Sequence, residues 1–498
     1  MKKVAKIKWY IIATLAIALL YTIQSCTREK IIIYSQFTQP VDLAEPSDSG
    51  IIFEEVPGLV WHSLAEAESY QVQMARSALF TELVFSETLT DTFYVYESSL
   101  TNGQYYWRVR AKNNNGIWGD WSDAMVWSFF INDNSLYMNL LSVVPTIGIA
   151  QDIFVVEEGP DSTIAYIADG QAGLMIVNVS NPEEPVVVGS VDLFNNDRAL
   201  SVWKVPGDEI AYVADLDGKI TTIDTHLPLD PFSMRNLSLG WDQNLQDIAG
   251  IVLQDTIYLF GVSSNFQRRK VNFYQVVYRD GIPGFGDVYV VPAFTIPADG
   301  LGVCQDSIPI VVEYYDEERD STSYEAQTGM FVFAAVSQAG LWWYDFSTTR
   351  SFEGVDTMLI YSPRYLGWGD TPSSALAVFA KGGYVYVADD YGGLQIFDLP
   401  DTIPAFDHDA PYEAIPELIS SINTSGRTKD VHVVNNYCYL ADGSGGLKII
   451  DITNPASPVF LAAYSTPYAY GVWADENYIY IADRDNGMMI FENGELID

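Results

Sequence analysis

The sequence predicts an all-β protein whose larger part is a ring of repeated four-stranded units, a β-propeller. Two observations lead to this prediction. A strand–turn–strand phrase recurs along the chain, and no helical periodicity separates its copies. The clearest copy is Ala441-Asp-Gly-Ser-Gly-Gly-Leu-Lys-Ile-Ile-Asp451. Similar copies begin at Ala168 and Ala388, and weaker ones begin at Ala214 and Ala482.

Each repeat unit is expected to contain four short strands. In the clearest unit these are residues 430–434, 437–441, 447–452 and 458–464. The Asp-Gly-Ser-Gly-Gly run between the second and third strands favours a tight turn, because glycine accepts positive φ and Asp bonds its own backbone. Asn454-Pro455 ends the third strand, since proline lacks the N–H that a sheet ladder needs.

The number of copies sets the number of blades. The Asp that follows the alanine recurs at Asp169, Asp215, Asp389, Asp442 and Asp483, and two degenerate copies place Gly261 and Val336 at this position. The spacings are then 46, 46, 75, 53, 53 and 41 residues, and most fit the roughly 40–50 residues of a blade. Seven blades are predicted, or six or eight if a degenerate copy is misassigned. The long interval indicates an acidic, polar insertion around Glu313–Thr328.

The ends of the repeat region indicate how the ring closes. The last copy stops after its third strand, near residues 488–492, whereas residues 136–145 form a strand-like segment before the first copy. An incomplete last blade would leave an unpaired edge. We therefore expect residues 137–144 to pair with the strand near Met488–Phe491.

These repeats resemble the LVIVD-repeat β-propeller family. The resemblance rests on the Tyr-Val/Ile-Ala-Asp, Gly-Leu-x-Ile-x-Asp and Asn-Pro-x-x-Pro elements, seen in Tyr166–Pro185 and Tyr439–Pro458, and it covers about residues 135–498. It implies a fold and a cell-surface association rather than a biochemical activity.

The N-terminus has the pattern of a secretory signal. Four lysines precede an apolar run from Trp9 to Leu20, and Ile23-Gln-Ser-Cys26 resembles a bacterial lipobox. We predict a signal peptide over residues 1–25, lipidation of Cys26 and a linker over residues 26–36. An uncleaved anchor and an ordinary signal peptide are the alternatives. Thr27 favours the outer membrane, so a lipid-anchored protein of the bacterial envelope is expected, on either its periplasmic or its surface face.

The net charge of the chain narrows the classes of partner. The net charge is −39, and without residues 1–25 the chain would carry 22 Lys and Arg against 65 Asp and Glu, a net charge of −43. Such a surface repels nucleic acid and anionic headgroups.

After lipidation Cys304 and Cys438 would remain, in different predicted blades, so buried thiols are expected rather than a disulfide.

A second domain is predicted between the linker and the repeats. In Tyr105–Ala111 the residues Tyr105, Trp107, Val109 and Ala111 share one face of a strand, with Arg108 and Arg110 on the other. The Leu, Gly and Tyr before this strand resemble a tyrosine corner, and Trp118-Gly-Asp-Trp-Ser122 is similar to a Trp-Ser-x-Trp-Ser signature. Together they resemble a fibronectin type III β-sandwich over residues 37–131, with the propeller over 132–498. Trp118 and Trp121 are expected to stack on the two arginines.

The sequence contains no recognisable catalytic motif. His62, His226, His408 and His432 have no metal-ligand spacing, and His432 is expected to be structural. Asp215, Asp217, Asp483 and Asp485 are weak calcium candidates, because Asp-x-Asp-x-Gly can supply oxygen ligands. The loop from Asp215 or Asp483 lacks a Glu at the twelfth position, which favours a turn role. We expect no enzyme activity and no cofactor, with calcium as the open alternative.

The centre of the ring is the predicted binding site. The residues expected there begin the innermost strands or precede them, and mixed charge at a concave opening suits a ligand: Gln151, Asp152, Arg198, Asp247, Arg427, Lys429, Asp430 and Tyr470. Alternatively, these side chains bond one another and plug the channel. Trp342, Trp343, Tyr344 and Trp368 are a further candidate surface for stacking, although packing within a blade is the expected role of Trp342 and Trp343.

The predicted function is a binding or interaction platform for envelope proteins or polysaccharide. The alternatives are a propeller enzyme acting on glycans, a hydrolase or lyase with acids in the channel, and a purely structural envelope protein. Carboxylates that converge in an open channel would favour the glycosidase.

Overall fold

The computed structural model describes most of the chain between residues 40 and 493. The gaps within that span are residues 42, 46–49, 53–57, 66, 78, 82, 97, 99, 101–102, 123–126, 132–138, 195–196, 229, 239–243, 254–255, 265–269, 279–285, 317–320, 347–348, 351–359, 362–363, 405–412, 425 and 485. The predicted signal peptide, Cys26, the linker, His408 and Asp485 lie outside the described residues. The described secondary structure is built from strands, with no α-helix, and within it no helix could cross a membrane.

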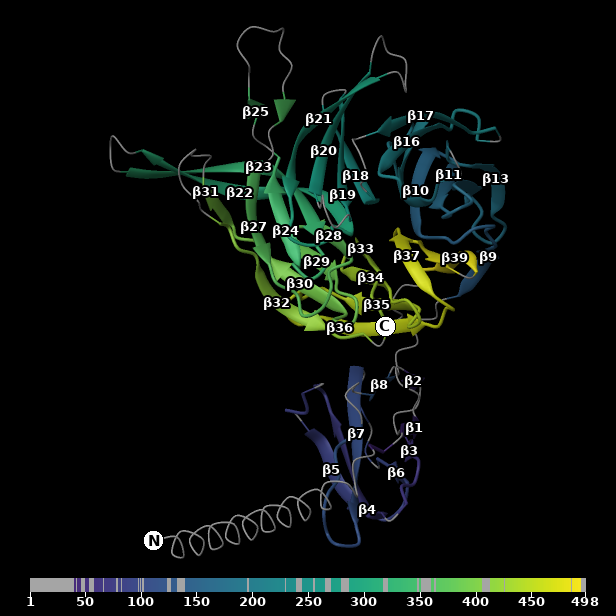
Figure 1. Cartoon of the computed structure of the whole chain (residues 1–498), viewed down its shortest axis with the longest axis vertical. Helices are drawn as coiled ribbons and strands as arrows, with labels where there is room; N and C mark the ends of the chain where they lie inside the picture. The colour runs from purple at the N-terminus through teal and green to yellow at the C-terminus, as the bar shows by residue number, and fades with distance from the viewer. Residues whose placement is uncertain are drawn as a thin grey trace, which may run out of the picture. The chain divides into compact units, whose positions relative to one another are not determined.

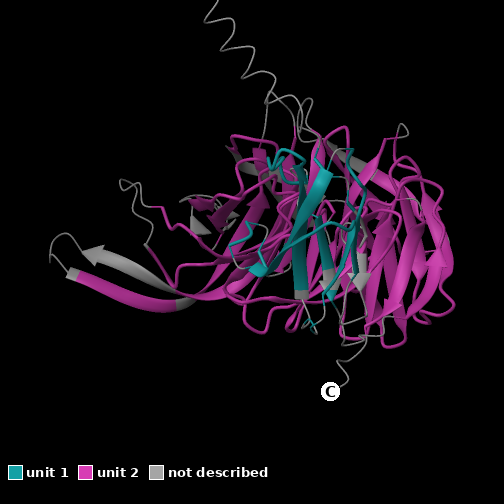
Figure 2. Ribbon diagram, turned by 90° about the horizontal axis from the view of Figure 1, so that it is seen from below, with its two compact units in different colours: residues 1–133 teal, residues 134–498 magenta. Residues whose placement is uncertain are grey.

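The chain divides into two compact units, residues 1–133 and 134–498, coloured separately in Figure 2. Unit 1 contains two sheets. The first has the order β1-β3-β6 and the second the order β2-β8-β7-β4-β5. The bounds of these strands are β1 Leu43–Glu45, β2 Gly50–Ile52, β3 Gly58–Trp61, β4 Ala67–Ala75, β5 Leu83–Leu89, β6 Phe93–Val95, β7 Gly103–Asn113 and β8 Trp127–Ile131.

Unit 1 has its core between the two sheets. Trp61 of β3 and Trp107 of β7 are almost fully buried in one apolar cluster with Val72 and Phe129. The alternation predicted for β7 is confirmed, because Tyr105, Trp107, Val109 and Ala111 are all buried. Unit 1 is therefore a two-sheet β-sandwich.

The opposite face of β7 carries a ladder of cations and rings. The Arg108 guanidinium lies 3.9 Å from the Phe80 ring centroid and 4.2 Å from that of Trp121. Arg110 lies 4.4 Å from Trp121 and 4.9 Å from Trp118. The expected stacking of both tryptophans on these arginines is confirmed, and the attraction of each cation for the ring faces ties the segment after β7 to the sheet.

The described residues of unit 2 form seven sheets of four or five strands, which we number 1 to 7 along the chain. The inner strand of each contacts the inner strand of the next, and the inner strand of sheet 7 contacts that of sheet 1. Figure 1 shows the resulting ring around a common centre. Apolar clusters lie between neighbouring sheets; Ile176 of sheet 1, for example, packs with Val202 and Val213 of sheet 2.

The strands of sheets 1 to 3 follow one another in chain order, each pairing antiparallel with the next. Their bounds are β10 Asp152–Gly159, β11 Ser162–Ala168, β12 Leu174–Asn178 and β13 Val186–Val191 in sheet 1; β14 Ala199–Lys204, β15 Ile210–Asp215, β16 Lys219–Asp224 and β17 Phe232–Ser238 in sheet 2; β18 Leu245–Leu253, β19 Thr256–Ser263, β20 Lys270–Tyr278 and β21 Gly286–Thr295 in sheet 3.

Sheet 4 departs from this pattern. Its order is β27-β24-β23-β22-β31, and a separate two-stranded sheet, β25 with β26, follows β24 in the chain. The bounds are β22 Gly302–Asp316, β23 Ser321–Ala335, β24 Leu341–Asp345, β25 Thr349–Arg350, β26 Ile360–Tyr361, β27 Arg364–Gly369 and β31 Thr402–Pro404. The insertion predicted around residues 313–328 is the distal half of the long β22–β23 hairpin, which projects from the ring in Figure 1.

Sheets 5 to 7 complete the ring. Their strands are β28 Ala377–Lys381, β29 Tyr384–Ala388, β30 Leu394–Asp398 and β32 Glu417–Ile422 in sheet 5; β33 Asp430–Val434, β34 Tyr437–Ala441, β35 Leu447–Asp451 and β36 Val459–Tyr464 in sheet 6; β37 Ala469–Ala474, β38 Tyr478–Asp483, β39 Gly487–Glu492 and β9 Leu140–Val144 in sheet 7.

The expected closure of the ring is confirmed. β9, from the start of unit 2, pairs antiparallel with β39, from its end, with Val144 opposite Met488 and Leu140 opposite Phe491. One expected position is wrong. In sheet 3 the residue equivalent to Asp215 is Ser263, two residues after Gly261, because Leu245 pairs with Ser263 as Ala199 pairs with Asp215. Sheet 3 therefore has Ser263 where sheets 1, 2, 5, 6 and 7 have the Asp that marks the turn.

Candidate functional site

Three carboxylates face the centre of the ring. Asp152, Asp247 and Asp430 lie at or near the start of the inner strands of sheets 1, 3 and 6, and each precedes an Ile or Val. One oxygen of each carboxylate accepts the backbone N–H of that next residue, at 2.7 Å for Asp152 and 2.8 Å for Asp247 and Asp430. This local bond fixes the direction in which each side chain points.

The second oxygen of each carboxylate joins two sheets. Asp152 accepts the N–H of Val202 at 2.9 Å, which links sheets 1 and 2. Asp247 accepts the N–H of Val303 and Asp430 that of Val472, both at 2.8 Å, which links sheets 3 to 4 and 6 to 7. We call these three residues the channel staples, since each ties its inner strand to the next one around the ring.

The other inner strands carry small residues at the position equivalent to a staple. The positions equivalent to Asp152 in the other inner strands are Ser201, Gly302, Ala377 and Gly471. A Cβ added to Gly302 would lie 2.6 Å from the Ala377 Cα, so only glycine fits there. The Ser201 hydroxyl donates to Asp247 at 2.6 Å and so links sheets 2 and 3.

Burial controls the ionisation of this site. Loss of solvation raises the pKa of all three staples, and the negative charge of Asp152 adds to the effect on the other two. The pKa of Asp247 rises to about 7. Burial and the nearby Arg427 lower the pKa of Lys429. The centre of the ring therefore favours neutral acids over a set of full charges.

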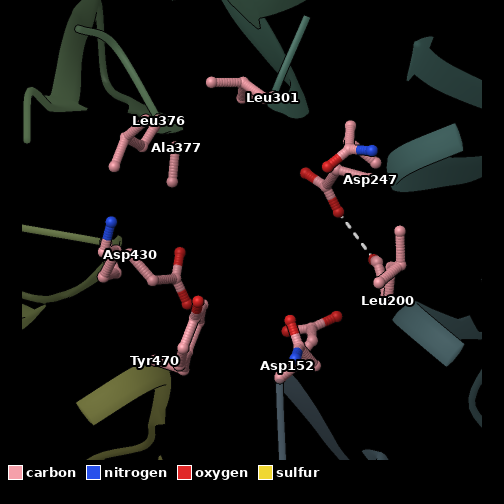
Figure 3. Close-up of a pocket in the computed structure, with 12 residues that line it drawn as sticks. Asp152, Leu200, Asp247, Leu301, Leu376, Ala377, Asp430 and Tyr470 are labelled. Carbon is pink, nitrogen blue, oxygen red and sulfur yellow. Dashed lines mark hydrogen bonds between the residues drawn. The ribbon is translucent and has the colours of Figure 1, made fainter. Parts of the chain in front are cut away.

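The staples line an open cavity of about 310 Å³ at the centre of the ring. Figure 3 shows Asp152, Asp247, Asp430 and Tyr470 pointing into this space. Its lining mixes charged, amide and apolar side chains: Gln151, Asp152, Leu200, Ser201, Gln246, Asp247, Leu301, Leu376, Ala377, Lys429, Asp430 and Tyr470. We call it the channel cavity.

Six of the eight predicted residues line the channel cavity: Gln151, Asp152, Asp247, Lys429, Asp430 and Tyr470. The other lining residues were missed because leucine, alanine, serine and glutamine carry no charge signal in a single sequence. Their place in the repeat is the signal that finds them, since Leu200, Gln246, Leu301 and Leu376 each precede the position equivalent to a staple.

Arg198 and Arg427 do not line the cavity. The Arg427 guanidinium makes two bonds to Asp390, with Nε 2.7 Å from one carboxylate oxygen and Nη2 3.0 Å from the other. Asp390 follows the end of β29, and Lys429 Nζ also lies 3.6 Å from it. Arg198 is exposed, and its backbone N–H donates to Asp197. Arg427 and Lys429 therefore both contact Asp390, which sequence reasoning did not single out and which does not line the cavity.

The repeated Asp of the Asp-Gly phrase holds the loop that enters its own sheet. Asp442 accepts the hydroxyls of Thr424 at 2.6 Å and Thr428 at 2.9 Å, and the N–H of Gly426 at 2.9 Å. Asp169, Asp389 and Asp483 accept the N–H groups of Gly148, Ser373 and Tyr468 in the same way. The repeated Asp therefore fixes the conformation of the loop that leads into the inner strand of its own sheet.

Replacing Asp442 by Ala is expected to lower the free energy of unfolding by about 3 kcal/mol, because it leaves buried hydroxyl and N–H donors without an acceptor. The measurement is urea denaturation followed by circular dichroism. Asp451→Ala is the matched control on the same sheet, since Asp451 accepts one N–H, from Thr453, at an exposed turn. Equal losses for the two variants would contradict the structural role of Asp442.

The calcium candidates serve similar turns. Asp215 accepts the N–H of Lys219 at 2.8 Å and the hydroxyl of Thr221 at 3.3 Å. Asp217 pairs with Lys219 at 3.0 Å. Asp483 accepts the N–H groups of Tyr468 and Asn486. Within the described part of the chain, no three His, Cys, Asp or Glu side chains gather in a metal-binding group.

His432 packs between aromatic rings, and two of the four aromatic candidates are fully buried. His432 lies between Phe379 and Trp473, with ring centroids 4.8 and 5.5 Å away, and burial lowers its pKa to about 3, so it stays neutral. Trp343 and Tyr344 are fully buried, whereas Trp368 keeps 41% of its surface exposed. The four aromatic residues therefore do not form one stacking surface.

A second cavity, of about 420 Å³, lies between the base of β22 and the turn that joins β28 to β29. Ile308, Ile310 and Phe331 line one part of it, and Asp398 and Asp401 another. Its acids are exposed, and sequence reasoning did not identify it.

A comparison with protein families gives a match within unit 2. The family model described as LVIVD repeat matches residues 147–193, 372–401, 425–466 and 468–491, which fall in sheets 1, 5, 6 and 7. Unit 2 is a repeat β-propeller. The comparison with curated proteins gives no match.

Three solved structures similar to this chain are 8–10% identical to it. The structure of U3-55K is 8% identical, with a TM-score of 0.47, and the match covers 72% of this chain and 99% of that one. The Cps50 (Swd1) β-propeller domain of Myceliophteria thermophila is 10% identical, with a TM-score of 0.45, over 71% of this chain and 99% of that one. The computationally designed Ika8 protein is 9% identical, with a TM-score of 0.40, over 79% of this chain and 94% of that one. We infer nothing about function from similarities this low.

Proposed function

We propose that the protein is a binding platform of the bacterial envelope. In this proposal a lipid on Cys26 anchors the chain, a fibronectin type III-like sandwich over residues 37–131 acts as a spacer, and a seven-bladed propeller over residues 132–498 binds a protein or polysaccharide partner at the channel cavity. The two-sheet core of unit 1 and the seven sheets of unit 2 support this domain assignment.

The observation that carries the proposal is the use of the channel carboxylates. Each staple has one oxygen bonded to its own strand and the other bonded to the next sheet. Carboxylates held in this way maintain the shape of a cavity but are poorly free to act as nucleophile or base. Tyr470, Gln151 and Gln246 supply further polar groups, and the leucines supply apolar contact, which together suit recognition.

The test is capture of partners from the organism's own envelope with the lipidated protein, together with binding to a glycan array. The double variant Gln246→Ala/Tyr470→Ala changes the cavity lining and leaves the staples in place. We expect this variant to lose about tenfold or more in affinity for any captured partner. Phe232→Ala, at an exposed position of the outer strand β17, is the control for this site. Unchanged binding by the double variant, or no partner and no glycan bound, would exclude the proposal.

One observation favours the enzyme alternative. Burial and the charge of Asp152 raise the pKa of Asp247 to about 7, which suits a general acid at neutral pH, and glycan hydrolases use a pair of carboxylates. Product formation from a bound glycan, abolished by Asp247→Asn while binding persists, would identify a hydrolase or lyase. Binding without product would support the platform.

The lipid anchor makes its own prediction. Replacing Cys26 by Ala removes the only thiol that a lipobox can present for acylation, so the protein is expected to move from the membrane fraction to the soluble fraction. Fractionation after labelling with a palmitate analogue measures this. Ser25→Ala, which keeps a small residue before the cysteine, is the control. Membrane retention of Cys26→Ala would indicate an uncleaved anchor instead.

A further inference from the structure

The β22–β23 hairpin extends well beyond the sheet that it belongs to. The two strands pair along their whole lengths, from Gly302 opposite Ala335 to Asp316 opposite Ser321. β24 covers only Phe331–Ala335 of β23. Among the described strands, none pairs with the outer edge of β23 between Ser321 and Gly329. Figure 1 shows this half of the hairpin projecting away from the ring. We call it the ribbon.

The register identifies which backbone groups the ribbon presents at this edge. The Met330 carbonyl points away from β22, because it accepts the N–H of Phe346. Successive residues of a strand alternate in direction, and the pairing of β23 with β22 has no bulge. Thr322, Tyr324, Ala326 and Thr328 therefore direct their N–H and C=O groups outward. Their side chains are also exposed, with 65% of the Tyr324 surface accessible.

The other edge of the ribbon already binds an added strand. β31 pairs parallel with β22, with Thr402, Ile403 and Pro404 beside Val311, Val312 and Glu313. A two-stranded hairpin without a buried face is marginally stable alone, and an exposed edge of this length is a template for pairing with another chain. The ribbon thus has one edge covered by its own chain over Val311–Glu313, and among the described strands none pairs with its other edge.

The charge of the ribbon selects the partner. Residues 313–325 contain six acids and a single Arg, in a chain of net charge −39. A second copy of the same edge would bring like charges together, whereas a basic strand would be attracted. We propose that the open edge of β23, from Thr322 to Thr328, binds an extended basic segment of another protein as an added β-strand.

This site lies apart from the channel cavity, so the proposal goes beyond the proposed function and each can fail without the other. Recognition at the ribbon comes from backbone bonds and acidic side chains. It does not involve the staples. The channel variant Gln246→Ala/Tyr470→Ala should bind the ribbon's partner normally.

The test uses the full chain and labelled peptides of about eight residues that alternate Lys with Val or Thr. Fluorescence anisotropy is expected to show saturable binding that weakens with salt. The same peptide N-methylated at alternate residues keeps its charge but loses the donors of one edge, and it should bind at least about tenfold more weakly. A peptide with Glu in place of Lys should not bind.

Two variants of the chain complete the test. Ala326→Pro removes one outward N–H, and proline is tolerated where that N–H faces solvent, so binding should fall about tenfold at unchanged thermal stability. Glu325→Lys should weaken binding of the basic peptide without changing the backbone. If Ala326→Pro does not fold, the N-methylated peptide on the unaltered chain decides. Equal affinity for the methylated peptide, or concentration-dependent dimers abolished by Ala326→Pro, would overturn the proposal.

Discussion

Replacing Val144 by Asp is expected to destabilise unit 2 by about 4 kcal/mol, because it places an unpaired charge in a closed apolar cluster. Val144 is 6% exposed and packs with Met488 and Ile490 of β39 and with Val155 of sheet 1. This cluster lies between sheets 7 and 1. Sheet 7 takes strands from both ends of unit 2, so the substitution is expected to weaken the closure of the ring. The measurement is the free energy of unfolding in urea.

The adjacent residue supplies the control. Val143 lies in the same strand as Val144 and pairs with Met489 of β39, but its side chain is 43% exposed on the opposite face of the sheet. Val143→Asp is therefore expected to cost less than about 1 kcal/mol. Hydrogen exchange should show that Val144→Asp, and not Val143→Asp, releases the amides of β39. Equal effects of the two substitutions would mean that β9 does not close the ring.

This closure was predictable from the sequence because it follows from counting strands. Sheet 7 takes β37, β38 and β39 from the last repeat, which supplies no fourth strand, and the apolar, strand-like segment before the first repeat was left without a partner. The hairpin insertion was predictable for the same reason, since it lengthened one interval between repeats. Both depend on periodicity, which a single sequence displays.

The roles of the channel residues were predictable only in part. The place of Asp152, Asp247 and Asp430 near the axis followed from the repeat. Their bonds to Val202, Val303 and Val472 did not, because these are contacts between sheets that the repeat pattern does not specify. Arg427 was misplaced because its partner, Asp390, lies in the turn after β29 of the neighbouring sheet, and the repeat pattern does not specify contacts between sheets.

The staples also predict a pH dependence of stability. Burial raises the pKa of Asp247 to about 7, above the ordinary value of 3.8, with the charge of Asp152 adding to the effect. The folded protein then holds more protons than the unfolded chain between about pH 4 and 7. The contribution of Asp247 to stability is therefore fully present below about pH 4 and is lost as the pH rises through 7. Asp152 and Asp430 act in the same direction, and Lys429 is the nearby cation.

The measurement compares thermal unfolding of the parent protein and Asp247→Asn across this range. Asparagine keeps an oxygen to accept N–H bonds but cannot ionise, so the parent should lose stability relative to the variant by a few degrees in Tm between about pH 4 and 7. Asp217→Asn is the control, because the bond from Lys219 lowers the pKa of Asp217 and moves its effect below that window. If Tm changed with pH in the same way for the parent and Asp247→Asn, the pKa of Asp247 in the channel would equal its value in water. The cavity would then be a solvated opening rather than a site that favours neutral acids.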